Sequence, residues 1–191
     1  MFFIKLLFIV CIGKCFENVI FAAYNPLLTY TIRFQKVSFQ PNFTGNYTIE
    51  KHREKEFVNG FLSLDSPQTI DKIVVVFHRC NPEGVDCEYF QSWSMTDLCP
   101  KLRDKNQIWS SWYGAFDPQP VCPVKKVNSF IRNGTIDFEQ AVRWYPDVVN
   151  YQWKVSQKFY AGERYIGTYT FELSVFGYRK RNKKPSKQSK Q

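Results

Sequence analysis

The sequence predicts an all-β protein, an immunoglobulin-like antiparallel β-sandwich with a short helical segment and loops held by disulfide bonds. About eight short segments alternate apolar and polar residues, turn residues separate them, and only residues 88–113 leave room for a helix. An α/β fold is disfavoured because it would need long helical crossovers between its strands. The 191 residues, 44% of them hydrophobic, are sufficient for one domain with its own core, which we place at residues 24–178.

The first predicted strand changes the parity of its alternation. Apolar side chains occupy every second position from Tyr30 to Phe34, and they resume in the opposite parity at Val37 and Phe39. One extra residue in a strand turns all later side chains to the other face of the sheet. The pattern therefore predicts a bulge near Gln35.

Further strands are predicted from period-two alternation or short apolar runs, and they cover residues 47–50, 57–64, 70–77, 128–131, 135–138, 149–155 and 165–175. The turn-forming segment 161–164, Ala-Gly-Glu-Arg, joins the last two strands as a hairpin. In the helical region, Pro100 would interrupt any single long helix.

Residues 1–22 are predicted to be a signal peptide. The stretch MFFIKLLFIVCIG at residues 1–13 joins an early lysine to an apolar run too short to cross a bilayer core of ~30 Å. The triplets that begin at Asn42, Asn46 and Asn133 match the acceptor pattern for N-glycosylation. Together these features predict a secreted, extracellular glycoprotein.

The formal charge of +9 is concentrated at the end of the chain. Residues 179–191, RKRNKKPSKQSKQ, hold seven basic residues and no acidic residue, and the body without this tail and the leader is nearly neutral. The charge therefore does not predict a nucleic-acid partner. Because the tail has no apolar residue, we expect it to be disordered, either as a solubilising tail or as an attachment to acidic membrane surfaces or glycans.

The mature chain is expected to contain four cysteines, Cys80, Cys87, Cys99 and Cys122. In an oxidising compartment they predict two disulfide bonds, for which three pairings are available. The pairing of Cys80 with Cys87 is favoured because residues 81–84, Asn-Pro-Glu-Gly, form a turn between them, and Cys99 with Cys122 then follows.

The sequence carries little material for catalysis or metal binding. It has two histidines, no Cys-x-x-Cys motif, no Gly-x-Ser-x-Gly motif and no glycine-rich phosphate loop. A nucleophile with its base, a zinc site and a phosphate site each need such residues at short spacing. We therefore predict a protein that is not an enzyme and that has neither a cofactor nor a metal.

Aromatic residues make up 18% of the chain and gather in two segments that lack a strand pattern. The candidate ligand-binding residues from these segments are Trp109, Trp112, Tyr113, Phe116, Trp144 and Tyr145. Loops seldom carry so many large apolar side chains unless these cap the core or line a site. The two interpretations are a cap on the core and the mouth of an apolar cavity between the sheets.

These features resemble the ML (lipid-recognition) domain family, and within it the ganglioside activator group, which secreted insect chemosensory proteins also resemble. The resemblance rests on the Cys80-x6-Cys87 spacing after an apolar strand, the segment Val121-Cys-Pro-Val-Lys125 and the terminal hairpin at 149–176, and it covers roughly residues 28–177. It implies a sandwich whose sheets splay apart to hold lipid. By position, residues 109–120 and 142–146 would border the entrance, which adds Val142 to the candidate ligand-binding residues.

The chain departs from the activator group in the final hairpin, where Gly167 is followed by Thr168 and not by a cysteine. The leading hypothesis is a secreted, non-enzymatic lipid-binding protein that carries, extracts or presents an apolar ligand in a cavity between two β-sheets. Its partners would be a lipid or another apolar small molecule and, through the tail, an acidic membrane. The alternative is a secreted interaction protein, such as a receptor ligand, chemosensory protein or effector, with a filled core and exposed aromatic residues.

Overall fold

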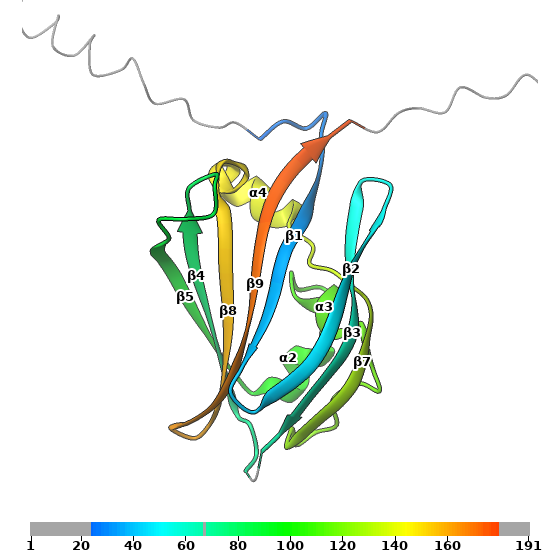
Figure 1. Ribbon diagram of the computed structural model, residues 1–191, viewed down its shortest axis with the longest axis vertical. Coiled ribbons are helices and arrows are strands. Elements are labelled where there is room, and N and C mark those ends of the chain that lie inside the picture. Colours follow the sequence, from blue (N-terminus) through cyan, green and yellow to red (C-terminus); the bar gives the residue numbers. More distant parts are fainter. Residues whose placement is uncertain (1–23, 67, 180–191) are drawn as a thin grey trace, which may run out of the picture.

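A computed structural model of the protein describes residues 24–66 and 68–179, which form two antiparallel β-sheets packed face to face (Figure 1). The five-stranded sheet has the strand order β1-β9-β8-β4-β5, and the four-stranded sheet has the order β2-β3-β7-β6. A mostly β protein with two antiparallel sheets is what the sequence predicts. The predicted signal peptide at 1–22 and the predicted tail, except Arg179, lie outside the described residues.

The strands and helices have the following bounds: β1 Thr29–Gln40, β2 Phe43–His52, β3 Lys55–Asp65, β4 Lys72–Cys80, β5 Glu88–Thr96, α2 Leu98–Arg103, α3 Ser110–Tyr113, β6 Phe116–Asp117, β7 Lys126–Gly134, α4 Glu139–Trp144, the 3-10 helix η1 Pro146–Asn150, β8 Gln152–Ala161 and β9 Arg164–Tyr178. Figure 1 shows α2 and α3 between the two sheets and α4 near one end of the five-stranded sheet. The helical cover, residues 98–113, thus closes one side of the sandwich.

The predicted bulge in β1 is confirmed. The register of β1 against β9 shifts between Phe34 and Lys36, which leaves Gln35 without a partner in the ladder. Phe34 and Val37 are both buried as a result, although they stand three positions apart. The extra residue therefore keeps the apolar side chains of both halves of β1 on the core face.

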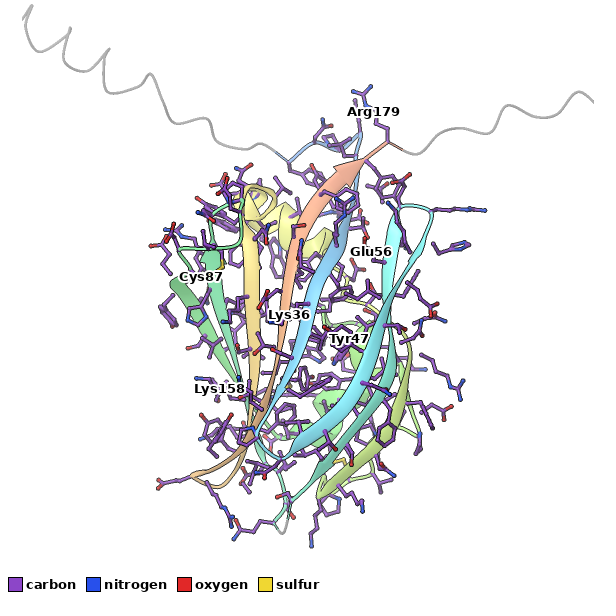
Figure 2. All side chains as sticks on the ribbon, in the orientation of Figure 1. Lys36, Tyr47, Glu56, Cys87, Lys158 and Arg179 are labelled. Carbon is purple, nitrogen blue, oxygen red and sulfur yellow. A yellow bond between two sulfur atoms is a disulfide. The ribbon has the colours of Figure 1, made fainter. Side chains whose placement is uncertain are left out.

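The hairpin of β8 and β9 is also confirmed, with a two-residue connection between Ala161 and Arg164. On β8 the side chains alternate, because Trp153, Val155 and Phe159 are buried in the core whereas lysines occupy the opposite face. Figure 2 labels one of these lysines, Lys158, on the outer side of the five-stranded sheet. Alternation of this kind is what a strand buried on one face requires.

Three predicted boundaries are wrong, and so is the expectation that only residues 88–113 leave room for a helix, because α4 and η1 lie outside that range. Residues 135–138 form an irregular segment before α4 and not a strand, and Val149 belongs to η1. The segment Glu88–Thr96, which was assigned to the region with room for helix, is the edge strand β5. Most of its side chains are exposed, so its sequence lacks the alternation of a half-buried strand, and its state depends on pairing with β4.

Both predicted disulfide bonds are present. Cys80 at the end of β4 is bonded to Cys87 before β5, and Cys99 on α2 is bonded to Cys122 in the loop before β7. The first bond closes the connection between two paired strands, and the second holds the helical cover to the chain that follows β6. Two disulfides are consistent with an extracellular protein. No helix among the described residues has the length and apolar character needed to span a membrane.

A buried carboxylate links the two sheets. Glu56 on β3 accepts a hydrogen bond from the backbone N–H of Phe34 on β1 at 2.8 Å, and it forms an ion pair with Arg33 at 3.6 Å. The Glu56 side chain is 12% exposed. A hydrogen bond to a charged, largely buried acceptor is stronger than one between neutral groups, so Glu56 fixes β1 against the second sheet.

Candidate functional site

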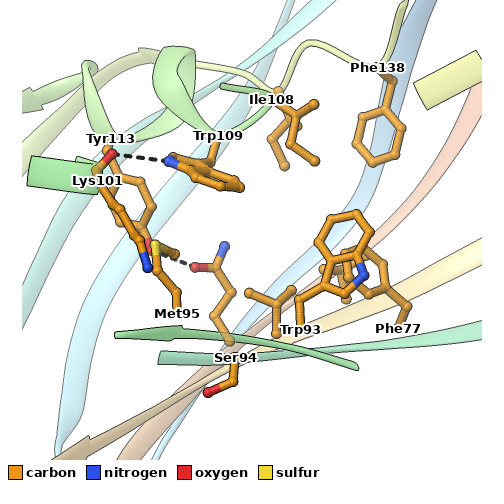
Figure 3. A pocket seen from close by; sticks show the side chains of 13 residues that line it. Phe77, Trp93, Ser94, Met95, Lys101, Ile108, Trp109, Tyr113 and Phe138 are labelled. Carbon is orange, nitrogen blue, oxygen red and sulfur yellow. Dashed lines mark hydrogen bonds between the residues drawn. The ribbon is translucent and has the colours of Figure 1, made fainter. Parts of the chain in front are cut away.

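The candidate site is an apolar cavity of about 230 Å³ that lies between the five-stranded sheet and the helical cover. Figure 3 shows Trp93 and Phe77 on one side of it and Ile108 and Trp109 on the other. The lining contains ten apolar or aromatic residues and three polar ones, and consists of Val75, Phe77, Trp93, Ser94, Met95, Lys101, Ile108, Trp109, Tyr113, Ile136, Phe138, Val155 and Gln157.

The floor of the cavity follows from strand alternation. Val75 and Phe77 on β4 and Val155 and Gln157 on β8 stand two positions apart on neighbouring strands, so all four turn to the same face of the sheet. Trp93 extends this surface on β5, with its ring centroid 4.7 Å from that of Phe77. Trp93 is 42% exposed, so the cavity reaches the protein surface along the edge strand.

The roof is formed by the helical cover and by the irregular segment before α4. Trp109 is fixed by a hydrogen bond from its Nε1–H to the carbonyl oxygen of Lys101 at 3.2 Å (Figure 3). Ile136 and Phe138 approach from the segment for which a strand was predicted.

A buried hydrogen-bond network borders the cavity. Trp112 donates its Nε1–H to the hydroxyl oxygen of Tyr169 at 3.0 Å, and Tyr169 donates its hydroxyl to Gln157 Oε1 at 2.9 Å. Tyr113 donates its hydroxyl to the same oxygen at 2.6 Å. The network thus joins α3 of the cover to both strands of the final hairpin.

Burial keeps both tyrosine hydroxyls in the network protonated. Burial raises the pKa of Tyr113 well above its usual value of 10.0. Burial, followed by the nearby Tyr113, raises the pKa of Tyr169 as well. Removing a proton would place a charge in an apolar environment, which is the costly form. Both groups therefore remain hydrogen-bond donors over the physiological range of pH.

Two of the residues proposed from the first aromatic segment, Trp109 and Tyr113, line the cavity. Trp112 is only 1% exposed and its ring packs edge-on against Phe171, so it lies in the core. Phe116 is buried as well, between the two sheets. The segment thus combines both interpretations, because part of it caps the core and part of it borders the cavity.

The residues proposed from the second segment lie apart from the cavity. Val142 is buried in the core, and Tyr145 packs against Phe90 at 5.3 Å between ring centroids. Trp144 is 77% exposed on α4. None of the three belongs to the cavity lining, so their role in ligand binding stays a prediction.

Space between the sheets themselves is nearly filled. An enclosed gap of about 20 Å³ remains there, lined by residues of both sheets that include Leu62, Ile73 and Phe116. This is about the volume that one water molecule needs. Tyr113 lines both this gap and the larger cavity, and so separates them. The sequence predicts a ligand space between the two sheets, and the larger apolar cavity lies between the five-stranded sheet and the helical cover.

Sequence reasoning missed most of the cavity lining. The sequence predicts Val75 and Phe77 only as strand residues, and it places Trp93 and Met95 in the region with room for a helix. One signal was available in β8, where Gln157 interrupts the apolar inward series between Val155 and Phe159. A polar residue on the buried face of a strand calls for a partner or a function.

The side chains of the three predicted glycosylation asparagines are exposed. Asn42 donates its Nδ2–H to the carbonyl oxygen of Ile166 at 2.6 Å. In the part of the chain that the structure describes, no three His, Cys, Asp or Glu side chains gather as a metal site.

No family model and no curated protein matches this chain.

Proposed function

We propose that this protein is a secreted, non-enzymatic carrier that binds a lipid or another apolar small molecule in the cavity under the helical cover. The observation that carries the proposal is the cavity itself, which is lined almost wholly by apolar side chains and reaches the surface beside Trp93. Apolar cavities with few polar groups are the usual form of small-molecule sites. The resemblance to the ML family leads to the same proposal.

The volume of the cavity limits the ligand. An engineered apolar cavity of ~150 Å³ holds benzene, whereas drug-sized ligands occupy roughly 300–1,000 Å³. At about 230 Å³, this cavity accepts a small apolar molecule or the end of an acyl chain. Burial of about eight methylene groups would contribute roughly 6 kcal/mol before the costs of association. A larger lipid would require the cover to move.

The alternative, a secreted interaction protein, is favoured by one observation. Trp144 exposes 77% of its surface on α4, and large exposed aromatic side chains are typical of protein interfaces. It lies outside the cavity lining, so the two functions are separable by mutation.

The proposal is tested by analysis of the ligand that the protein acquires during secretion. The full chain is expressed in eukaryotic cells, purified from the medium, denatured and extracted, and the extract is analysed by mass spectrometry. We expect a stoichiometric apolar compound. A clean extract, combined with no uptake of small fluorescent apolar probes, would move the proposal to the protein-binding alternative.

A pair of variants on one strand ties binding to the cavity. Val75→Trp introduces a large side chain into the cavity, whereas Val74→Trp places the same side chain on the opposite face of β4. We expect Val75→Trp to abolish probe uptake and Val74→Trp to retain it. If both variants still take up the probe, the ligand binds elsewhere in the protein.

A further inference from the structure

Gln157 is the deep polar group of the cavity. It is 6% exposed and stands on the floor among apolar side chains, on β8. The other two polar lining residues are placed differently, because Ser94 is exposed on β5 and Lys101 is half-buried on α2. These two keep access to bulk water, whereas the Gln157 carboxamide can meet only the protein or a molecule, water included, inside the cavity.

The hydrogen-bond network fixes which end of the carboxamide is free. The indole N–H of Trp112 can only donate, so the Tyr169 oxygen accepts it and its hydroxyl hydrogen is available to Gln157. Tyr113 also donates to Gln157, and its 3.4 Å contact with Tyr169 is the longest in the cluster. Reversal of the carboxamide would leave the Tyr113 hydroxyl hydrogen without an acceptor. The carbonyl oxygen of Gln157 therefore faces the tyrosines.

The amide nitrogen of Gln157 is left without a protein partner. Both of its side-chain hydrogen bonds are accepted by Oε1, and Nε2 donates none to any residue in the ranges 24–66 and 68–179. A carboxamide has two N–H donors, and a donor left unsatisfied beside an apolar guest is costly. An oxygen acceptor on a bound molecule would satisfy it.

We propose that the cavity selects apolar ligands that carry one oxygen acceptor, of the ketone, aldehyde or ester type, and that Gln157 Nε2 donates a hydrogen bond to that oxygen. This inference rests on the proposed function, and adds to it a chemical class of ligand. The apolar lining contacts the hydrocarbon part of the ligand, and the hydrogen-bond network fixes the orientation of the Gln157 carboxamide. Selection arises because a plain hydrocarbon would leave the Gln157 amide unpaired.

The test compares two probes of the same shape, 2-octanone and 2-methyl-1-octene, in which a CH₂ group replaces the ketone oxygen. Binding of each to the full secreted protein is measured by depletion of the volatile probe from the headspace. The readout is the ratio of the two dissociation constants, compared between wild type and variant. The two probes differ in hydration, but this difference is the same for wild type and variant, so it does not affect the comparison. Gln157→Leu removes the amide, and Gln91→Leu makes the same change at an exposed position of β5 outside the cavity.

We expect Gln157→Leu to shift this ratio against the ketone by roughly threefold to tenfold, as expected for one net hydrogen bond, and Gln91→Leu to leave it unchanged. Gln157→Met is the second variant, because its side chain has nearly the length of glutamine, carries no charge and has no N–H. It should shift the ratio in the same direction even if Gln157→Leu does not fold.

The outcomes separate the two proposals. If wild type binds both probes and neither Gln157 variant changes the ratio, the selection by Gln157 is overturned while the carrier function stands. If wild type binds neither probe and carries no apolar compound from secretion, the carrier function itself fails, and the inference fails with it.

Discussion

Replacement of two tryptophans that the sequence groups together should give opposite results. Trp112 is 1% exposed, packs edge-on against Phe116 and Phe171 and donates a hydrogen bond to Tyr169, whereas Trp144 is 77% exposed. Large aromatic residues replaced by alanine in a core cost about 3–5 kcal/mol, through lost burial and the cavity left behind. Replacements of exposed side chains change the free energy of unfolding by no more than about 0.5 kcal/mol.

These values are a large part of the stability of a domain, which is typically ~5–15 kcal/mol. For a protein of this size they correspond to a fall in Tm of roughly 6–20 °C for Trp112→Ala and of about 2 °C or less for Trp144→Ala. Trp112→Phe keeps most of the ring contacts and loses the hydrogen bond, so we expect an intermediate loss of about 1–2 kcal/mol.

The assay is urea unfolding followed by far-UV circular dichroism, with the midpoint and the slope determined for each variant. The reasoning would be refuted if Trp112→Ala lost less than about 1 kcal/mol, which is below the range for any core tryptophan. An equal loss in Trp144→Ala would refute it as well, because that side chain has little burial to lose. Probe uptake by Trp144→Ala, measured in parallel, tests its separate role at the predicted entrance.

Three further predictions follow from the contacts around the core. Burial raises the pKa values of Tyr113 and Tyr169 above that of tyrosine in the unfolded chain. The free energy of unfolding should therefore fall as pH rises above about 10, by up to about 1.4 kcal/mol per pH unit for each tyrosine. Urea unfolding at pH 8 and pH 11 should show a smaller fall when both tyrosines are replaced by phenylalanine. A steeper fall in that variant would contradict this. Replacement of Cys99 and Cys122 by serine removes a bond between residues 23 positions apart and should lower the free energy of unfolding by about 3.5 kcal/mol. Thermal unfolding of the double variant measures this loss. No change in Tm would show that the helical cover needs no covalent bond. Glu56→Ala leaves the backbone N–H of Phe34 on β1 without its acceptor and should lower the free energy of unfolding by about 1–3 kcal/mol. Amide hydrogen exchange in β1 should become faster. Exchange rates in β1 unchanged from wild type would argue against the link between the sheets.

The predicted ligand-binding residues show where local reasoning about the site stops. Trp109 and Tyr113 were found because aromatic residues in a segment without strand pattern need an apolar contact. The same argument selected Trp112, which fills the core, and Trp144, which faces solvent. Composition predicts that a large apolar side chain makes an apolar contact, but it does not predict which neighbour the side chain contacts. That depends on the path of the cover over the sheet.

The sequence by itself determined the two-sheet, mostly β architecture in outline, the bulge at Gln35, the final hairpin and both disulfide bonds. Most of these are local properties, because period-two alternation reports which face of a strand is buried, and a turn sequence brings Cys80 and Cys87 together. The bond of Cys99 with Cys122 follows as the remaining pair.

Only the tertiary structure decided that Glu88–Thr96 is a strand, that an apolar cavity lies under the helical cover and that Gln157 is the deeply buried polar residue of its lining. An exposed edge strand carries no burial pattern, so pairing with β4 decides its state. The cavity joins side chains from Val75 to Gln157, and the free amide depends on tyrosines that reach it from two other elements. Such properties arise from packing between distant segments, which no local pattern encodes.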